Sequence, residues 1–520
     1  MARLTCYDGV GCIGGNKILL EDGDTKLWLD FGTNYSRWGK FYEEYLKPKA
    51  CMGLYEPIQM GLVPPVCDLY RSDLVSSLAD PWRGIERQSI GNVDGILVSH
   101  AHLDHIGAIH YIKEDIPIYS SAMTLAIAKA TQDTGANTPD DYCYVTPCEE
   151  SETGELCSSN YRKTASRARH FVFMGESPSD NFREFWNTTP GSREHTPGAI
   201  GASAACGGLK VRRFPVDHSI YGACAWAIET SAGSVIYTGD LRCHGRQAEL
   251  TWRFAEEAGK LRPCALIIEG TRMKPKDIRT EEEDTRTEEQ VRRRALDEVK
   301  KAKGLVVADF GPRNVERLAS FLEIARETGR TLLLMPKDAY LLKSMALAAG
   351  NGEAPSLDDK SIGIYSEYEG STAAWRKKIK EDYADKLVRP YEVAKHQDKF
   401  ICCFSFFDVN ELAYIKPAPG SIWIYSSCEA FNEDMRIDLV RLGEWLCHHE
   451  MVFMGGDDED RNNPFHVSGH ACRSDLLKLI DIIRPEVVIP VHTEKPDLFR
   501  EELAGRCEVL LPERGMPTEL

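Results

Sequence analysis

The feature that most constrains this chain is a group of four metal-ligand side chains within six residues. They are His100, His102, Asp104 and His105, in the segment VSHAHLDHIGAIH. The apolar strand expected at 96–98 leads into them, and a helix-like segment is expected after His105. Alternate positions on an extended loop point in opposite directions, so His100 and His102 can face one metal and the other two a second metal. Imidazole with few carboxylates suits zinc, and an open coordination position makes such a site hydrolytic.

The remaining ligands of a two-metal site must come from distant segments, because four side chains of one loop cannot fill the coordination of two ions. Three candidates each follow a short apolar run, and they are His218, Asp240 and His492. A satisfied loop histidine or a turn aspartate is the alternative for each residue taken alone. Since all three sit at strand ends, as the first motif does, the set favours metal ligands.

The candidate ligands divide into two groups. One metal is expected to bind His100, His102 and His218, the other Asp104, His105 and His492, with Asp240 bridging both. Two such ions, about 3.5–4 Å apart, generate hydroxide from bound water and clamp the oxygens of an in-line displacement. Two Zn²⁺ are expected, with Mn²⁺ or Mg²⁺ as alternatives. Asp30 is expected to orient the motif loop by hydrogen bonding rather than to bind a metal.

Composition bounds the class of protein. A chain of 520 residues, 42% of them hydrophobic and 28% charged, is long enough for two to four globular domains. It has no apolar run of 18 residues and no signal-like start, which argues against membrane insertion and secretion. The 17 cysteines form no CxxC pair, so reduced thiols and a cytoplasmic location are expected.

The net charge of −17 argues against broad, non-specific attraction to polyanions. It does not exclude a polyanion at a metal-neutralised groove, because bound divalent cations dominate the field in their own site. Global charge therefore bears only weakly on the substrate.

Hydrophobic patterning divides the chain into three parts. In the first part, strands are expected at 209–214, 224–229 and 234–237 and a helix at 122–131. Two stretches in it, about 33–92 and 132–206, are expected to be insertions of short helices and loops and of irregular structure, respectively.

After about residue 255 short apolar strands alternate with helical patterns, which is typical of a parallel, doubly wound subdomain. The strands are expected at 266–269, 305–309 and 331–335, and 281–303 is expected to be a solvated amphipathic helix. At about 462 the chain returns to the first part, with a helix at 473–483 and a last strand at 487–491.

The order of the candidate site residues resembles that of the metallo-β-lactamase superfamily and, more narrowly, of its β-CASP nucleases. This order is Asp30, HAHLDH at 100–105, His218, Asp240 and His492. Glu269 in LIIEGTR, His470 in HVSGH and His492 in PVHTE match the three β-CASP motifs, and the last two segments are most similar to ribonuclease J. The resemblance implies an αββα sandwich, residues 1–255, with a parallel α/β cap inserted at 256–461 and a return at 462–520.

The resemblance also implies zinc-dependent hydrolysis of RNA phosphodiester bonds, in the 5′-to-3′ exonuclease mode, the endonuclease mode or both, with single-stranded RNA as partner. Asp104 or Asp240 would receive the proton of the attacking water. His470, oriented by Glu269, would stabilise the phosphate or protonate the leaving oxygen. Ser468 and His466 would bind a phosphate nearby, although a structural role fits His466 equally well.

Two departures from ribonuclease J stand out. That family continues past its third motif into an assembly domain, whereas this sequence ends 28 residues after His492, so a homo-oligomer of that kind is in doubt. The loop before HVSGH reads SSCEAFNEDM, residues 426–435, in place of a Gly- and Gln-containing turn. The basic segment 375–380, WRKKIK, is expected to be a solvated helix face rather than an RNA contact.

Three alternatives remain open. A DNA-directed β-CASP nuclease is the nearest competitor. A small-molecule metallo-hydrolase explains the ligands but leaves the cap, Glu269 and the SGH segment unexplained. A catalytically inactive RNA-binding relative is disfavoured by the intact ligand set.

Overall fold

The computed structural model describes the chain in eight stretches, residues 1–43, 45–135, 141–175, 177–275, 286–349, 354–427, 433–456 and 463–520. The chain forms two compact units. Unit 1 contains Met1–Cys243, Gln247–Lys276 and His470–Leu520, and unit 2 contains His244–Arg246 and Asp277–Gly469. Among the described helices, none combines the length and the apolar composition needed to cross a bilayer.

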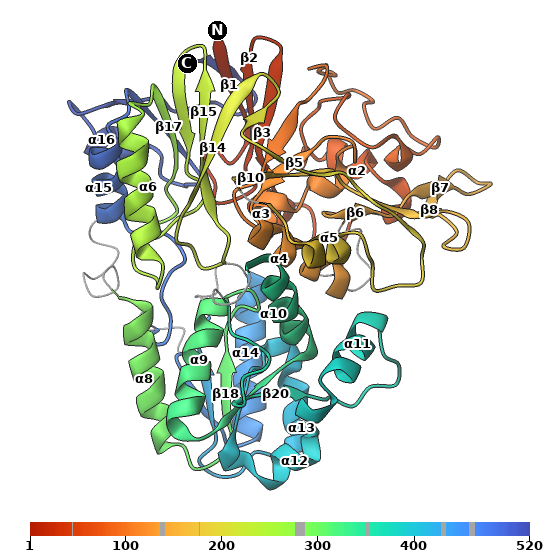
Figure 1. Ribbon diagram of the computed structural model, residues 1–520, viewed down its shortest axis with the longest axis vertical. Helices are drawn as coiled ribbons and strands as arrows, with labels where there is room; N and C mark the ends of the chain where they lie inside the picture. The colour runs from red at the N-terminus through yellow and green to blue at the C-terminus, as the bar shows by residue number, and fades with distance from the viewer. Residues whose placement is uncertain are drawn as a thin grey trace. The chain divides into compact units, whose positions relative to one another are not determined.

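The first sheet of unit 1 is mixed (Figure 1). Its strands lie in the order β12 (Ile200–Ser203), β10 (Phe171–Met174), β5 (Ile118–Ser120), β4 (Gly95–Leu97), β3 (Thr25–Phe31), β2 (Lys17–Asp22), β1 (Ala2–Asp8) and β27 (Pro517–Glu519). Strands from β12 to β3 are parallel neighbours, whereas β3 to β27 are antiparallel.

The second sheet of unit 1 carries β13 (Ala205–Cys206), β14 (Leu209–Pro215), β15 (Cys224–Thr230), β16 (Gly233–Tyr237), β17 (Ala265–Glu269), β25 (Val487–Val491) and β26 (Glu508–Val509), in that order. The strands from β13 to β16 are antiparallel, and those from β16 to β26 are parallel. The chain therefore returns from unit 2 to insert β25 beside β17.

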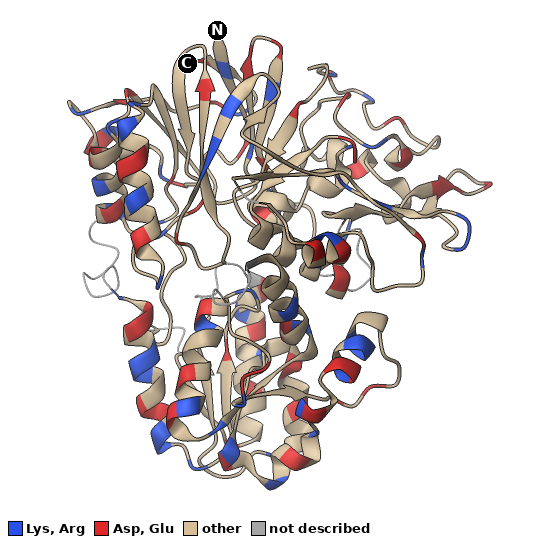
Figure 2. Cartoon of the chain, in the orientation of Figure 1, with Lys and Arg blue, Asp and Glu red and all other residues tan. Residues whose placement is uncertain are grey.

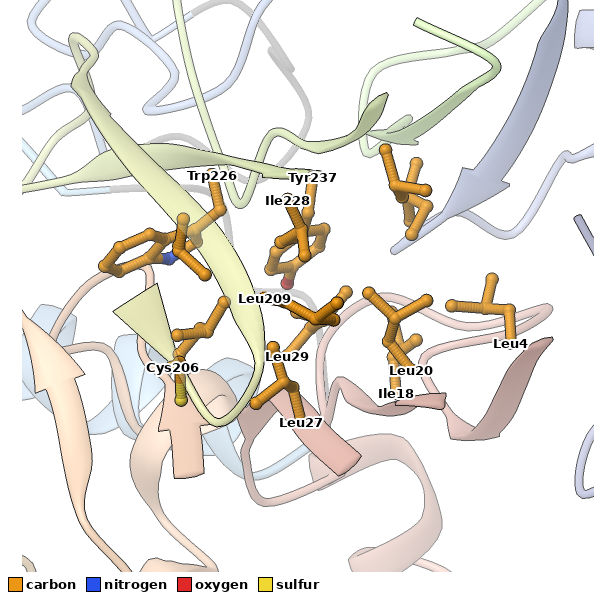
Figure 3. Packing of buried hydrophobic residues seen from close by; sticks show 14 of the residues in the cluster. Leu4, Ile18, Leu20, Leu27, Leu29, Cys206, Leu209, Trp226, Ile228 and Tyr237 are labelled. Atoms are coloured by element: carbon orange, nitrogen blue, oxygen red, sulfur yellow. The ribbon is translucent and has the colours of Figure 1, made fainter. Parts of the chain in front are cut away.

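The two sheets of unit 1 pack face to face around one apolar core. Leu20, Leu27 and Leu29 of the first sheet face Trp226 and Ile228 of the second, and all of them are buried (Figure 3). Alternating residues of each strand supply this layer because successive side chains point to opposite faces. The predicted αββα sandwich with a parallel α/β unit is confirmed.

The outer face of the second sheet is covered by α6 (Ala248–Lys260) and α15 (Arg473–Ile483). Phe254 and Leu479 are buried there, on the apolar stripes of the two helices. The other helices of unit 1 are α1 (Tyr35–Trp38), α2 (Tyr55–Gln59), α3 (Leu103–Ile106), α4 (Ala122–Thr134), α5 (Asp180–Trp186) and α16 (Asp497–Glu502), with 3₁₀ turns at Ala50–Met52, Ser72–Leu74 and Ile109–Tyr111.

Two small sheets complete unit 1. They contain β6 (Tyr144–Val145), β9 (Ser166–Ala168) and β11 (His195–Thr196), and the hairpin of β7 (Cys148–Glu150) and β8 (Leu156–Ser158). The expectation of irregular structure across 132–206 is wrong in part, because β10 and β12 extend the first sheet beyond β5. Such four-residue strands between Gly- and Pro-rich stretches gain their order from the neighbouring strand, which composition does not reveal.

Unit 2 is built on a fully parallel sheet. Its strands lie in the order β21 (Leu387–Val388), β20 (Ile362–Tyr365), β19 (Thr331–Leu334), β22 (Phe400–Cys402), β18 (Val306–Asp309), β23 (Ile422–Tyr425) and β24 (Val452–Met454). Near-continuous apolar strands such as TLLL suit a sheet that is buried on both faces. The expected strand at 266–269 was assigned to this sheet wrongly, since β17 pairs with β16 and β25 in unit 1.

The helices of unit 2 alternate along the chain with the strands of its sheet. They are α8 (Glu288–Lys301), α9 (Val315–Thr328), α10 (Pro336–Ala349), α11 (Ala374–Asp382), α12 (Pro390–Lys395), α13 (Leu412–Ile415) and α14 (Glu433–His448), with 3₁₀ turns at Ala384–Lys386, Gln397–Lys399 and Phe406–Glu411. Thr287 and Gln290 form a capping box on α8, and Gly329 ends α9 in a left-handed conformation. Acidic and basic side chains share α8, as expected for a solvated helix, although residues 281–285 lie outside the described chain (Figure 2).

A buried carboxyl at the end of β18 makes the stability of unit 2 depend on pH. Burial raises the pKa of Asp309 to about 7; Asp408 adds to the rise, and a hydrogen bond from Trp423 Nε1 at 3.1 Å opposes it. This pKa lies above the value of about 3.9 in an unfolded chain. The contribution of Asp309 to the free energy of unfolding is therefore fully present below about pH 4 and is lost as the pH rises to about 7.

We expect Asp309→Asn to remove this loss while keeping an oxygen for the Trp423 bond. The difference between the two pKa values corresponds to about 4 kcal/mol, so the variant should exceed the wild type by up to that amount at pH 8 and by much less at pH 5. Urea unfolding at both pH values measures the difference. An equal advantage of the variant at both would contradict the prediction.

Candidate metal centre

The histidine motif lies where β4 ends and α3 begins. His102 is extended at the N-cap position, and its carbonyl accepts hydrogen bonds from the amides of His105 at 2.9 Å and Ile106 at 3.0 Å. The helix therefore begins at Leu103, before Asp104 and His105, and not after His105 as expected. A helical turn, rather than strand alternation, directs these last two side chains.

His100, His102 and His218 converge on one point in unit 1. His102 Nδ1 lies 3.0 Å from His100 Nε2 and 3.1 Å from His218 Nε2. A zinc ion about 2.0–2.1 Å from each of two tetrahedral nitrogens sets those nitrogens about 3.3 Å apart. The three rings are thus spaced as ligands of one ion would be, and they form a candidate metal group.

Asp104, His105, His492 and Asp240 form the second candidate group. His492 Nε2 lies 3.2 Å from Asp104 Oδ2, and His105 Nε2 lies 3.1 Å from Asp240 Oδ2. His105 and His492 are buried, whereas the Asp104 side chain is 24% exposed. This group therefore has an opening toward solvent at Asp104.

Asp240 lies between the two groups. Its Oδ2 is 3.7 Å from His100 Nε2 and 3.9 Å from His218 Nε2 on one side, and 3.5 Å from His492 Nε2 on the other. Its Oδ1 is buried and has no hydrogen-bond partner within the described part of the chain. A buried carboxylate oxygen without a partner is costly unless a cation binds it, so the position fits a bridging ligand.

Asp30 ties the motif to both sheets. It accepts hydrogen bonds from the Ser99 amide and hydroxyl, both at 2.7 Å, and from Tyr237 Oη at 2.5 Å, and its Oδ2 lies 2.7 Å from His105 Nδ1. Asp30 has a positive φ of 56°, a strained conformation for a residue with a Cβ. Through these contacts Asp30 would orient the motif loop.

His492 is held by contacts that the sequence did not indicate. It has a φ of 52°, its amide donates to the Gly9 carbonyl at 2.8 Å, and its Nδ1 lies 2.8 Å from Thr271 Oγ1. Thr271 follows Glu269 by two residues, and only the pairing of β17 with β25 brings it to His492. A threonine after a strand carries no signal of such a role.

Glycines permit the close approach that places Asp104. The Gly15 amide donates to the Asp104 carbonyl at 2.9 Å. A Cβ on Gly32 would lie 1.7 Å from that carbonyl oxygen, and one on Gly14 would lie 2.6 Å from Asp104 Oδ2. No other residue fits either position while this packing is kept.

The charges of the centre suit a cation. Burial and the neighbouring imidazoles lower the pKa of His100 and His218 well below the usual value, so both rings are neutral donors. Burial opposes ionisation of Asp240, but His105 and His492 outweigh it and hold its pKa well below the usual value. Despite burial, Asp240, Asp104 and Asp30 in turn raise the pKa of His105 well above its usual value, so this ring carries a proton that a bound metal ion would displace. Neutral imidazoles and ionised carboxylates are the forms that bind zinc.

His470 and Glu269 form a pair beside this centre. His470 Nδ1 lies 3.1 Å from Glu269 Oε1 and 3.8 Å from Asp240 Oδ2. Glu269 is buried and accepts hydrogen bonds from the amides of Leu241 at 3.2 Å and Thr271 at 3.0 Å. Burial lowers the pKa of His470, but Glu269 and Asp240 outweigh it and raise this pKa to about 9.

The two other predicted phosphate-binding residues, His466 and Ser468, belong to unit 2. Arg317 donates to Glu288 through Nε and Nη2, both at 2.9 Å, and to the Phe465 carbonyl through Nη1 at 2.8 Å. Arg286 donates to the His466 carbonyl at 3.0 Å. These arginines fix the backbone of the segment, and its role toward a phosphate stays a prediction.

Two further predictions concern unit 2. The WRKKIK segment lies in α11, where Trp375 is buried and Lys378 pairs with Asp382 at 3.0 Å, in agreement with a solvated helix face. Of the loop SSCEAFNEDM, residues 428–432 lie outside the described chain.

Two family models match separate parts of the chain. Residues 62–182 match the family model described as a beta-lactamase superfamily domain, and residues 461–509 match that of the Zn-dependent metallo-hydrolase RNA specificity domain. The second match contains His470 and His492. The two models therefore match residues on both sides of the β-CASP motif residue Glu269 in the sequence.

Curated relatives cover most of the chain at low identity. Ribonuclease J 2 of Staphylococcus epidermidis is 21% identical over 473 residues, 88% of this chain and 69% of that protein. Ribonuclease J 2 of Staphylococcus saprophyticus is 22% identical over 471 residues, with the same two coverages.

A solved structure has the same fold. A protein of unknown function from Enterococcus faecalis V583 aligns over 100% of both chains with a TM-score of 0.65 and 23% identity. With the ordered ligands, the Glu269–His470 pair and the two matched domains, the chain is similar to the metal-dependent hydrolases of the metallo-β-lactamase superfamily and, among its β-CASP nucleases, to ribonuclease J.

Proposed function

We propose that this protein is a ribonuclease that hydrolyses the phosphodiester bonds of single-stranded RNA, as a 5′-to-3′ exonuclease, an endonuclease or both. The observation that carries the proposal is the His470–Glu269 pair, 3.1 Å apart, next to the carboxylate that lies between the two ligand groups. Hydrolysis of a small ester at the metal ions does not require a separate histidine–carboxylate acid of this kind. The matched RNA specificity domain and the Ribonuclease J 2 relatives support RNA as substrate.

The ligand set fits two zinc ions. Five imidazoles and two carboxylates gather in two groups that meet at Asp240, and nitrogen-rich donor sets favour zinc over magnesium or calcium. The buried Asp240 Oδ1 supplies an acceptor that the described protein atoms leave unused. When bound, the ions would acidify water and neutralise charge on the phosphate.

His470 is suited to act as the acid. Its Nδ1 faces the buried Glu269 carboxylate, which raises the pKa of the imidazole, and the ring is partly exposed beside Asp240. It donates to a phosphate oxygen or gives its proton to the leaving oxygen, while Glu269 holds the ring and balances its charge. Asp104, which is open to solvent, or Asp240 takes the proton of the attacking water.

The substrate class is tested with end-labelled RNA and DNA of one sequence, incubated with zinc-loaded protein. We expect cleavage of 5′-monophosphorylated RNA, with mononucleotides released first in the exonuclease mode and internal fragments in the endonuclease mode. Asp104→Ala should abolish both patterns. Cleavage of DNA alone, or of neither polymer, would refute the ribonuclease proposal.

The number of ions is tested by metal analysis after dialysis. The wild type should hold two zinc ions per chain, and His218→Ala, which removes a ligand of the first group, should hold about one. His110→Ala is the matched control, because His110 follows the same motif but belongs to neither group. Zinc should also raise the melting temperature of the wild type. A wild type with one ion would contradict the assignment.

The acid pair is tested by Glu269→Gln and His470→Ala. Removal of a positioned acid typically costs about 10²–10⁴-fold in rate, so kcat on RNA should fall by that range in His470→Ala. Glu269→Gln keeps the shape but not the charge, and we expect a smaller loss in kcat. Zinc content should stay unchanged in both. A variant that loses zinc with its activity would make this pair part of the metal site instead.

A further inference from the structure

A segment with several exposed aromatic side chains begins three residues after Gly32, which lies against the Asp104 backbone. It comprises residues 35–43 and 45–49, from α1 to the segment before the first 3₁₀ turn, and is called the aromatic platform here. Tyr35 is 49%, Phe41 44% and Tyr45 82% exposed, and Leu46 is exposed beside them. Single exposed apolar residues are ordinary, but several within twelve positions indicate a binding surface.

The platform interleaves these rings with cations. The sequence 35–49 contains Arg37, Lys40, Lys47 and Lys49 against two glutamates, a local charge of +2 in a chain of −17. Arg37 lies 3.5 Å from Asp8, whereas the three lysines form no salt bridge with the residues that the structure describes. The lysine charges are therefore available to an anion from solvent.

The platform is attached directly to the wall of the metal centre. Gly32 lies against the Asp104 backbone, and the Thr33 amide donates to the Leu103 carbonyl at 2.9 Å. Asn34 Nδ2 donates to Asp8 Oδ1 at 2.7 Å, and the next residue, Gly9, accepts the His492 amide. Three residues span at most about 11 Å, so Tyr35 lies within a few nucleotides of a phosphate bound at Asp104.

We propose that the aromatic platform binds the RNA strand next to the scissile phosphate, with bases stacked on Tyr35, Phe41 and Tyr45. Lys40, Lys47 and Lys49 of the same segment would contact the phosphates of that strand. Aromatic stacking with interspersed cations is how single strands are bound without sequence preference. This inference rests on the proposed function and adds to it a specific RNA-binding surface.

A protein partner fits the platform less well. Lysine is depleted in protein interfaces, whereas aromatic residues are enriched. Here three lysines share a segment of fifteen residues with the rings. Charge complementarity therefore favours a polyanion with flat apolar faces.

The test measures binding of a labelled 12-nucleotide single-stranded RNA with a hydrolysis-resistant phosphorothioate backbone to zinc-loaded protein. We expect the double variant Phe41→Ala and Tyr45→Ala to bind at least ten-fold more weakly, and Phe41→Trp with Tyr45→Trp to keep the affinity. Phe407→Ala is the matched control, since this phenylalanine is 78% exposed but precedes Asp408. It should bind as the wild type does.

A second readout separates this inference from the proposed function. Hydrolysis of bis(p-nitrophenyl) phosphate needs only the metal centre, so the double variant should hydrolyse it like the wild type while its KM for RNA rises. If the wild type cleaves RNA and the double variant binds RNA with the same affinity as the wild type, the RNA-binding role of the aromatic platform is refuted and the ribonuclease proposal stands. A wild type that hydrolyses the ester but neither binds nor cleaves RNA would overturn the ribonuclease proposal with it.

The partner class is tested by sedimentation of the same variants. A change in oligomeric state with unchanged RNA affinity would show a contact between copies of the chain and overturn the inference. Replacement of Lys40, Lys47 and Lys49 by Gln should weaken RNA binding and reduce its dependence on salt concentration. An unchanged salt dependence would show that these lysines do not contact the RNA phosphates.

Discussion

The buried carboxylate of Asp30 is the interaction on which the metal centre depends. It lies in β3 of the first sheet, accepts a hydrogen bond from Tyr237 of the second sheet, and holds Ser99 and His105 of the motif. One side chain thus fixes the distance between the sheets at the point where the ligands meet. The strained φ of Asp30 is maintained because four contacts determine its position.

The ligands gather because they follow strands that end at one edge of the sandwich. Parallel pairing sets β16, β17 and β25 so that the residues after them share that edge. The end of β4, in the first sheet, is brought to the same edge by the contacts of Asp30 with Ser99 and Tyr237. His100, Asp240 and His492 follow three of these strands, and Glu269 ends the fourth. Gathering so many imidazoles in a dry site is unfavourable without a cation, so metal binding and folding of this edge are linked.

Much of the architecture could be predicted from patterning. The strands β14, β15, β16 and β25 and the helix α15 lie where their apolar periodicity places them, because a buried face requires it. The sheet to which β17 belongs could not be predicted, because a buried parallel strand has the same apolar sequence pattern in unit 1 as in unit 2. Strands β10 and β12 were missed since their order comes from pairing and not from their own composition.

The sequence by itself determined the donor chemistry of the site. Closely spaced histidines and aspartates after apolar strands leave few roles other than metal binding, and their order is specific to one superfamily. Only the tertiary structure decided which side chains meet within 4.8 Å, and that Thr271 and Tyr237 support them. Such contacts join residues up to several hundred positions apart, and no local pattern records a distance in space. Exposure of the aromatic platform is likewise decided by the folded chain, since the same tyrosines and phenylalanine could equally have filled a core.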